Sequence, residues 1–167
     1  MRWSFKLAKL WGIDIYVHYT FMLLLIWIFF SRGAKNDWTT SLISVFFTLI
    51  VFGVVTLHEY GHALTARHFG IATRDITLWP FGGVATLQGL PQTPRQEVLV
   101  ALAGPAVNFV LALATYLFTD FIFIPHLAAN FIPIVQVYGV EVLYWFMWSN
   151  IVLMAFNLIP AFPMDGG

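Results

Sequence analysis

The sequence predicts an α-helical membrane protein with about four transmembrane helices and a small β-hairpin or sheet between the second and third. Its 167 residues are 60% hydrophobic and 10% charged, whereas about 25% of residues are charged in an ordinary soluble domain. Between the second and third helices, residues 70–90 are rich in glycine, threonine and β-branched side chains, which is typical of strands. Four apolar segments approach or exceed the length that crosses a bilayer: 15–31, 38–62, 98–119 and 142–161.

The segments around these spans have signals of their own. Residues 3–14 mix basic and apolar side chains and predict a short interfacial strand or helix. No small-x-small cleavage site follows the first span, so that span is expected to be a retained helix rather than a cleaved signal peptide. Gly82-Gly83 predicts a turn or bulge within 70–90. Residues 121–140 are interrupted by prolines and predict a loop or interfacial segment rather than a further span.

The composition excludes some functions and narrows the metal chemistry. The formal net charge is zero, so nothing electrostatic favours nucleic-acid binding. Cysteine is absent, which removes disulfides and thiolate ligands. Five histidines and eight carboxylates are therefore the strong metal-ligand candidates.

The distribution of Lys and Arg predicts the orientation of this integral, multi-pass membrane protein. Cytoplasmic segments are enriched in positive charge. The segments before the first span and after the second carry six Lys and Arg, and the loop after the first span carries two. The N-terminus is therefore expected to be cytoplasmic. The six are Arg2, Lys6, Lys9, Arg67, Arg74 and Arg95, and the two are Arg32 and Lys35.

The second span ends in His58-Glu59-Tyr60-Gly61-His62. Residues four apart share one face of a helix, so His58 and His62 can bind one zinc ion while Glu59 approaches its water. A charged side chain facing lipid costs about 3 kcal/mol or more, so this cluster is expected to face a protein interior or a wet cavity. The alternative is a pair of structural histidines bonded to carbonyl groups, and the spacing with Glu59 disfavours it.

A stable zinc site needs a third protein ligand. Among the other carboxylates, Asp165 follows the last span, after the proline pair Pro160 and Pro163. With two spans between His62 and Asp165, both residues come to the cytoplasmic side. If 121–140 also crossed the membrane, Asp165 would emerge on the far side and could not reach the metal.

These residues together resemble the site-2 protease family of intramembrane zinc metalloproteases. The resemblance is to its compact bacterial and archaeal branch without a PDZ domain, which includes the sporulation-factor processing enzyme, and it implies a prokaryotic cell membrane. It implies a single transmembrane metalloprotease core over 1–167, and the family's further helices and any CBS domain are expected to be absent. It covers HEYGH, Phe81-Gly82-Gly83-Val84, Ala103-Gly104-Pro105 with Asn108, and residues 157–166.

The resemblance also implies a function and a set of site residues. One zinc ion is expected on His58, His62 and Asp165, with Glu59 as the general base. The expected activity is hydrolysis of membrane-associated proteins near the cytoplasmic side of the bilayer, as in regulated intramembrane proteolysis. The partners are then the protein substrate and the lipid bilayer, not nucleic acid, and a homo-oligomer is left open.

Four residues are expected to bind substrate: Asn157, Pro163, Gly82 and Gly83. The prolines after Asn157 unwind the helix, so Asn157 is placed near substrate backbone or the oxyanion, with an interhelical contact as the alternative. Strand addition of an unwound substrate at Gly82-Gly83 is weighed against a simple connecting hairpin. Asn108 is expected to pack between helices rather than to act in catalysis.

Two other classes of function stay open from the residues alone. A metal-binding or metal-transporting membrane protein without peptidase activity would need polar residues along a continuous pore. The spans offer few polar residues beyond the HEYGH cluster. A catalytically inactive scaffold is disfavoured because Glu59 is intact.

Overall fold

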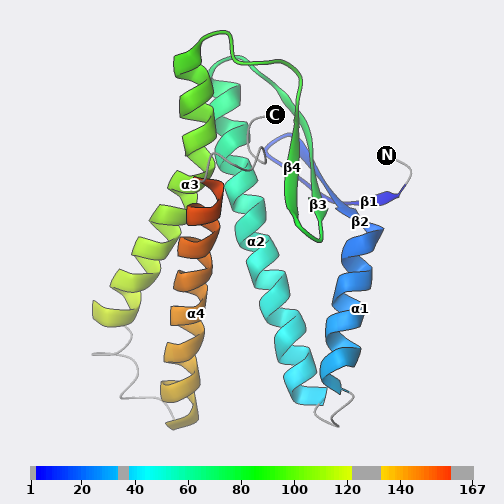
Figure 1. Ribbon diagram of the computed structural model, residues 1–167, viewed down its shortest axis with the longest axis vertical. Coiled ribbons are helices and arrows are strands. Elements are labelled where there is room, and N and C mark those ends of the chain that lie inside the picture. The colour runs from blue at the N-terminus through cyan, green and yellow to red at the C-terminus, as the bar shows by residue number, and fades with distance from the viewer. Residues whose placement is uncertain (1–2, 34–37, 122–132, 159–167) are drawn as a thin grey trace. The chain divides into compact units, whose positions relative to one another are not determined.

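The structure, a computed structural model, describes residues 3–33, 38–121 and 133–158 (Figure 1). The chain divides into two compact units, Met1–Val100 and Ala101–Gly167. The first unit contains a small sheet, two helices and the start of a third. The second contains the rest of that helix and a fourth.

The sheet has four strands in the order β1-β2-β3-β4. The strands are β1 (Ser4–Leu10), β2 (Ile13–His18), β3 (Thr73–Trp79) and β4 (Gly82–Leu87). The outer pairs are antiparallel and the central pair, β2 with β3, is parallel. A parallel pair needs a long crossover connection, and here it is the helical hairpin of α1 (Tyr19–Gly33) and α2 (Trp38–His68).

The central strand β2 alternates apolar and polar side chains. In β2 the buried residues Ile13, Ile15 and Val17 alternate with half-buried polar ones, as expected for a strand with one face in the core. Ile76 and Leu78 of β3 are also buried. In Figure 1, α1 and α2 run side by side away from the sheet, and α2 contacts β3 and β4. Phe21 of α1 packs on Phe52 of α2, with ring centroids 4.3 Å apart.

The second unit is formed by most of α3 (Pro94–Leu117) and by α4 (Pro133–Asn157). Each of these helices carries one completely buried asparagine, Asn108 in α3 and Asn150 in α4. Tyr144 of α4 donates a hydrogen bond of 3.0 Å to Asp120, which follows α3. Polar side chains that are buried between helices, or bonded from one helix to the next, are typical of membrane bundles.

The coarse fold prediction is confirmed: the protein is mostly helical with a small sheet. Within the described residues, three helices are long and apolar enough to cross a membrane: Trp38–His68, Pro94–Phe121 and Gly139–Asn157. The helix Tyr19–Ser31 is apolar but shorter.

Two boundaries and the position of the sheet differ from the prediction. Residues 15–18 belong to β2 and not to the first helix, because they pair with β1 and β3. The sheet therefore also includes the N-terminal segment and is not confined to 70–90. Residues 133–140 belong to α4 and not to a loop, since a proline is favoured at the first position of a helix. Residues 122–132 lie outside the described residues.

Candidate metal centre

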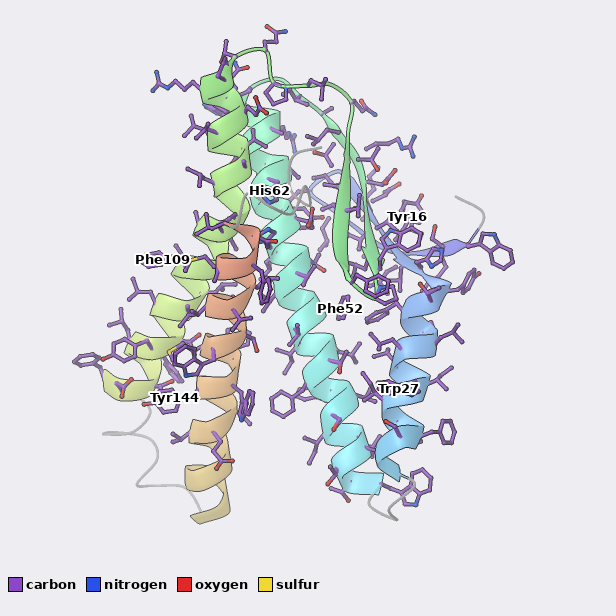
Figure 2. The ribbon with its side chains drawn as sticks, viewed as in Figure 1. Tyr16, Trp27, Phe52, His62, Phe109 and Tyr144 are labelled. Carbon is purple, nitrogen blue, oxygen red and sulfur yellow. The ribbon has the colours of Figure 1, made fainter. Side chains whose placement is uncertain are left out.

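The HEYGH segment is the buried part of a long apolar helix. His58, Glu59, Tyr60 and His62 are between 2% and 7% exposed, whereas large apolar residues earlier in α2, such as Leu42 and Phe46, are 61% exposed. Figure 2 shows His62 in the half of α2 that lies along the sheet. Ionisable groups in a membrane-length helix are thus withdrawn from the surface that lipid would contact, as their solvation requires.

His58 and His62 direct the same ring nitrogen at each other. Their Nε2 atoms are 3.0 Å apart, and the rings meet edge to face with an interplanar angle of 77°. The spacing of four residues on a helix produces this approach because both side chains leave the same face. The pair is the geometric core of the candidate site.

The orientation of His62 is set by α3. Nδ1 of His62 lies 2.7 Å from the carbonyl oxygen of Val100. A carbonyl can only accept, so Nδ1 carries the proton and the lone pair of a neutral His62 is on Nε2, toward His58. Metal-binding histidines usually have such a carbonyl or carboxylate partner on the other ring nitrogen.

This donor set fits zinc. Two imidazole nitrogens 3.0 Å apart can both reach one ion at a Zn–N distance of about 2.0–2.1 Å. Within the part of the chain that the structure describes, no group of three or more His, Asp or Glu side chains surrounds a common point. Asp165, the third ligand that the sequence predicts, lies outside the described residues.

Glu59 is held against β4 at Gly83. A Cβ atom added to Gly83 would lie 3.1 Å from Cδ of Glu59 and 2.5 Å from its Cγ, and the second distance is closer than real Cβ atoms approach. Only glycine therefore lets β4 come this near to the carboxylate. Gly82 has a φ of 147° and open space around it, so its glycine is required by the backbone conformation and not by packing.

The remaining predicted site residues belong to the second unit or lie outside the described residues. Asn157 is the last residue of α4 and belongs to the second unit. Pro163, like Asp165, lies outside the described residues. Asn108 is completely buried in α3.

The sequence did not predict the two hydrogen bonds that join α2 to the turn between β1 and β2. Tyr60 donates a hydrogen bond to the carbonyl oxygen of Leu10, and Arg67 donates one to that of Trp11. The turn signal Trp11-Gly12 between two alternating segments could have indicated the hairpin. No pattern in the neighbouring sequence indicates that this hairpin contacts α2.

A zinc-type histidine pair and a carboxylate, buried in a membrane-length helix and covered by a small sheet, are the features expected of the membrane-embedded metalloprotease class. The family model described as peptidase family M50 matches residues 46–138. The chain belongs to this family, and the resemblance to site-2 proteases is confirmed.

Known relatives agree with this assignment. The solved structure of the site-2 protease from Methanocaldococcus jannaschii is similar over 99% of this chain and 68% of its own, with a TM-score of 0.71 and 34% identity. A zinc metalloprotease of the same organism is 34% identical over 167 residues, which are 100% of this chain and 44% of that protein. Stage IV sporulation protein FB of Bacillus subtilis is 27% identical over 115 residues, 68% of this chain and 35% of that protein. The chain thus spans less than half the length of these two curated relatives.

Proposed function

We propose that this protein is a zinc-dependent intramembrane endopeptidase that hydrolyses membrane-associated proteins in or near the bilayer, on the cytoplasmic side. The observation that carries the proposal is the buried His58–His62 pair. Its Nε2 atoms lie 3.0 Å apart, and the Val100 carbonyl sets the tautomer of His62. A pair used only for packing does not require an adjacent buried glutamate.

His58 and His62 would hold the ion together with Asp165. When bound, zinc supplies a Lewis acid that polarises the scissile carbonyl and makes water acidic near neutral pH. His62 keeps its ring orientation during this chemistry because its other nitrogen is bonded to Val100.

Glu59 would act as general base and acid. It lies next to His58 in the chain, is 7% exposed and is pressed against the backbone of β4 at Gly83. A carboxylate in such a place can accept the proton of the attacking water and return it to the leaving amine. Its restricted surroundings keep it in one position for both transfers.

The edge of the sheet beside Glu59 would bind the substrate. The strand order makes β4 an edge strand, and its Gly83 touches the proposed base. An unwound substrate segment can add to such an edge through main-chain hydrogen bonds, which would bring its peptide bonds along the site. Asn157 and Pro163 are proposed as further substrate contacts from the resemblance.

The rest of the topology is proposed on the same basis. The chain forms one transmembrane metalloprotease core over 1–167, with α1 as a fourth membrane helix and a cytoplasmic N-terminus in a prokaryotic cell membrane. Cleavage at the cytoplasmic side would release a protein in regulated intramembrane proteolysis. A homo-oligomer is left open.

The decisive experiment compares Glu59→Gln with Glu97→Gln, an exposed glutamate in the first turn of α3. Each full-length protein is reconstituted with a single-span substrate, and hydrolysis and zinc content are measured. Glu59→Gln is expected to lose about 10²–10⁴-fold in rate and to keep its zinc, because a base is removed and no ligand. Glu97→Gln should match wild type. Full activity of Glu59→Gln, or metal flux into vesicles without hydrolysis, would overturn the proposal.

A further inference from the structure

The turn between β1 and β2 contains an unfavourable backbone conformation. Trp11 and Gly12 have φ angles of 48° and 88°. A two-residue hairpin turn of this kind requires a positive φ at both positions. Glycine accepts that freely, but a bulky residue such as tryptophan seldom adopts it. Contacts outside the hairpin must therefore contribute to holding the turn.

Those contacts come from α2. The Tyr60 hydroxyl donates a hydrogen bond of 3.0 Å to the carbonyl oxygen of Leu10. The Arg67 guanidinium donates one of 3.1 Å to the carbonyl oxygen of Trp11. The Trp11 ring meets the Tyr60 ring edge to face, with centroids 5.3 Å apart. Tyr60 and Arg67 are about two helical turns apart, so both contact the β1–β2 hairpin turn from one face of α2.

That face is opposite the histidine pair. Each residue of a helix advances about 100°, so His58 and His62 point about 160° away from Tyr60 on either side. Glu59 lies between these directions and contacts Gly83 of β4. Both the turn and β4 belong to one sheet. The sheet therefore contacts the HEYGH segment of α2 at two different angles, at Tyr60 and at Glu59.

Two contacts at different angles fix the rotation of a helix about its axis. A side-chain tip about 5–6 Å from the axis moves about 1 Å for a rotation of 10°. A displacement of that size can lower a reaction rate about 10²-fold. Contacts that fix the rotation of α2 about its axis would therefore set the positions of both histidines and of Glu59.

We infer that Tyr60 is a positioning residue, which with Arg67 fastens α2 to the Leu10–Trp11 turn and so places His58, Glu59 and His62. The inference rests on the proposed function above. Tyr60 acts through the helix and does not touch the metal or the substrate.

The test compares Tyr60→Phe with Tyr19→Phe in the full-length protein. Tyr60→Phe keeps the ring and removes only the hydroxyl. Tyr19 is an exposed tyrosine at the start of α1, so its variant is the matched control. The measurements are the zinc Kd by chelator competition, the visible spectrum of the cobalt-substituted protein, and kcat and KM for a single-span substrate.

Tyr60→Phe is expected to lower kcat about tenfold or more, to leave KM within about twofold, to weaken zinc several-fold and to change the cobalt spectrum. Tyr19→Phe is expected to match wild type in all four. If the wild type is active and a folded Tyr60→Phe has the same kcat, zinc Kd and cobalt spectrum, the inference is overturned and the proposed function is not. A wild type that neither binds zinc nor cleaves would remove the proposed function, and the inference with it.

Arg67→Gln decides the question if Tyr60→Phe does not fold. Arg67 is exposed, so its loss leaves the core intact while it removes the bond to Trp11. A decrease of about two- to fivefold in kcat, together with weaker zinc binding and a changed cobalt spectrum, would support the inference. Unchanged kcat and cobalt spectrum would overturn it.

Discussion

The Nδ1 atom of His62 lies 2.7 Å from the carbonyl oxygen of Val100, a residue 38 positions further along the chain. This contact joins α2 to the start of α3 and fixes which ring nitrogen of His62 faces His58. The acceptor is a main-chain atom, so a side-chain substitution at residue 100 does not remove it. The histidine pair is thus oriented by the fold as well as by its spacing.

Zinc retention should depend on His58, His62 and Asp165. His58→Ala, His62→Ala and Asp165→Asn are each expected to lose most of the bound zinc, because the remaining two protein ligands do not make a stable site. Metal analysis of the purified protein measures this directly. Asp120→Asn, whose side chain can still accept the bond from Tyr144, is the control. Wild-type zinc content in Asp165→Asn would remove Asp165 from the site.

Gly83→Ala should lower kcat strongly and change the free energy of unfolding less. The new Cβ would meet Cγ of Glu59 at 2.5 Å, so the flexible Glu59 side chain must move while the backbone can stay. We expect a loss of about tenfold or more in kcat and unchanged zinc content. Gly89→Ala is the matched control, since its Cβ would lie 3.8 Å from Ile71, an ordinary contact. Equal kcat for the two variants would show that the approach of β4 does not position Glu59.

The central strand pair should contribute strongly to stability. Ile76 of β3 is completely buried, and Ile76→Ala is expected to lower the free energy of unfolding by about 2–5 kcal/mol. Leu7→Ala in β1 is the comparison. Because Leu7 is 62% exposed, this substitution should change the free energy of unfolding by about 0.5 kcal/mol or less. Unfolding in detergent by increasing denaturant provides the measurement. Similar losses in both variants would contradict the placement of the core.

The orientation can be tested with single cysteines, because the chain contains none. A cysteine at Lys35 should react with a membrane-impermeant thiol reagent on intact cells. One at Arg95, which is exposed just inside α3, should react only after the membrane is permeabilised. The charge distribution predicts this difference. The opposite pattern would reverse the proposed topology.

Local sequence patterns were sufficient to predict the long helices and the histidine pair. Hydropathy identifies a membrane-length helix from about 20 consecutive residues, and α2 agrees with it. The approach of His58 and His62 follows from helical periodicity alone. The two strands within 70–90, β3 and β4, also have a local signal in their composition and turn.

Other features depend on partners distant in the chain. Residues 15–18 are apolar enough to begin a helix, yet they form part of β2 because β1 and β3 offer them backbone hydrogen bonds. The start of α4 at Pro133 has no clear local signal, because a proline in an apolar segment can interrupt a helix or begin one.

By itself, the sequence determined that this is a membrane metalloprotease fold with a histidine pair on one helix face, since hydropathy and the i, i+4 spacing act over one helix. Only the tertiary structure decided how that helix is held: Val100 contacts His62, Gly83 lies against Glu59, and Leu10 is bonded to Tyr60. The physical reason is that these contacts join different elements. Their strength depends on strand register and helix rotation, which no short stretch of sequence specifies.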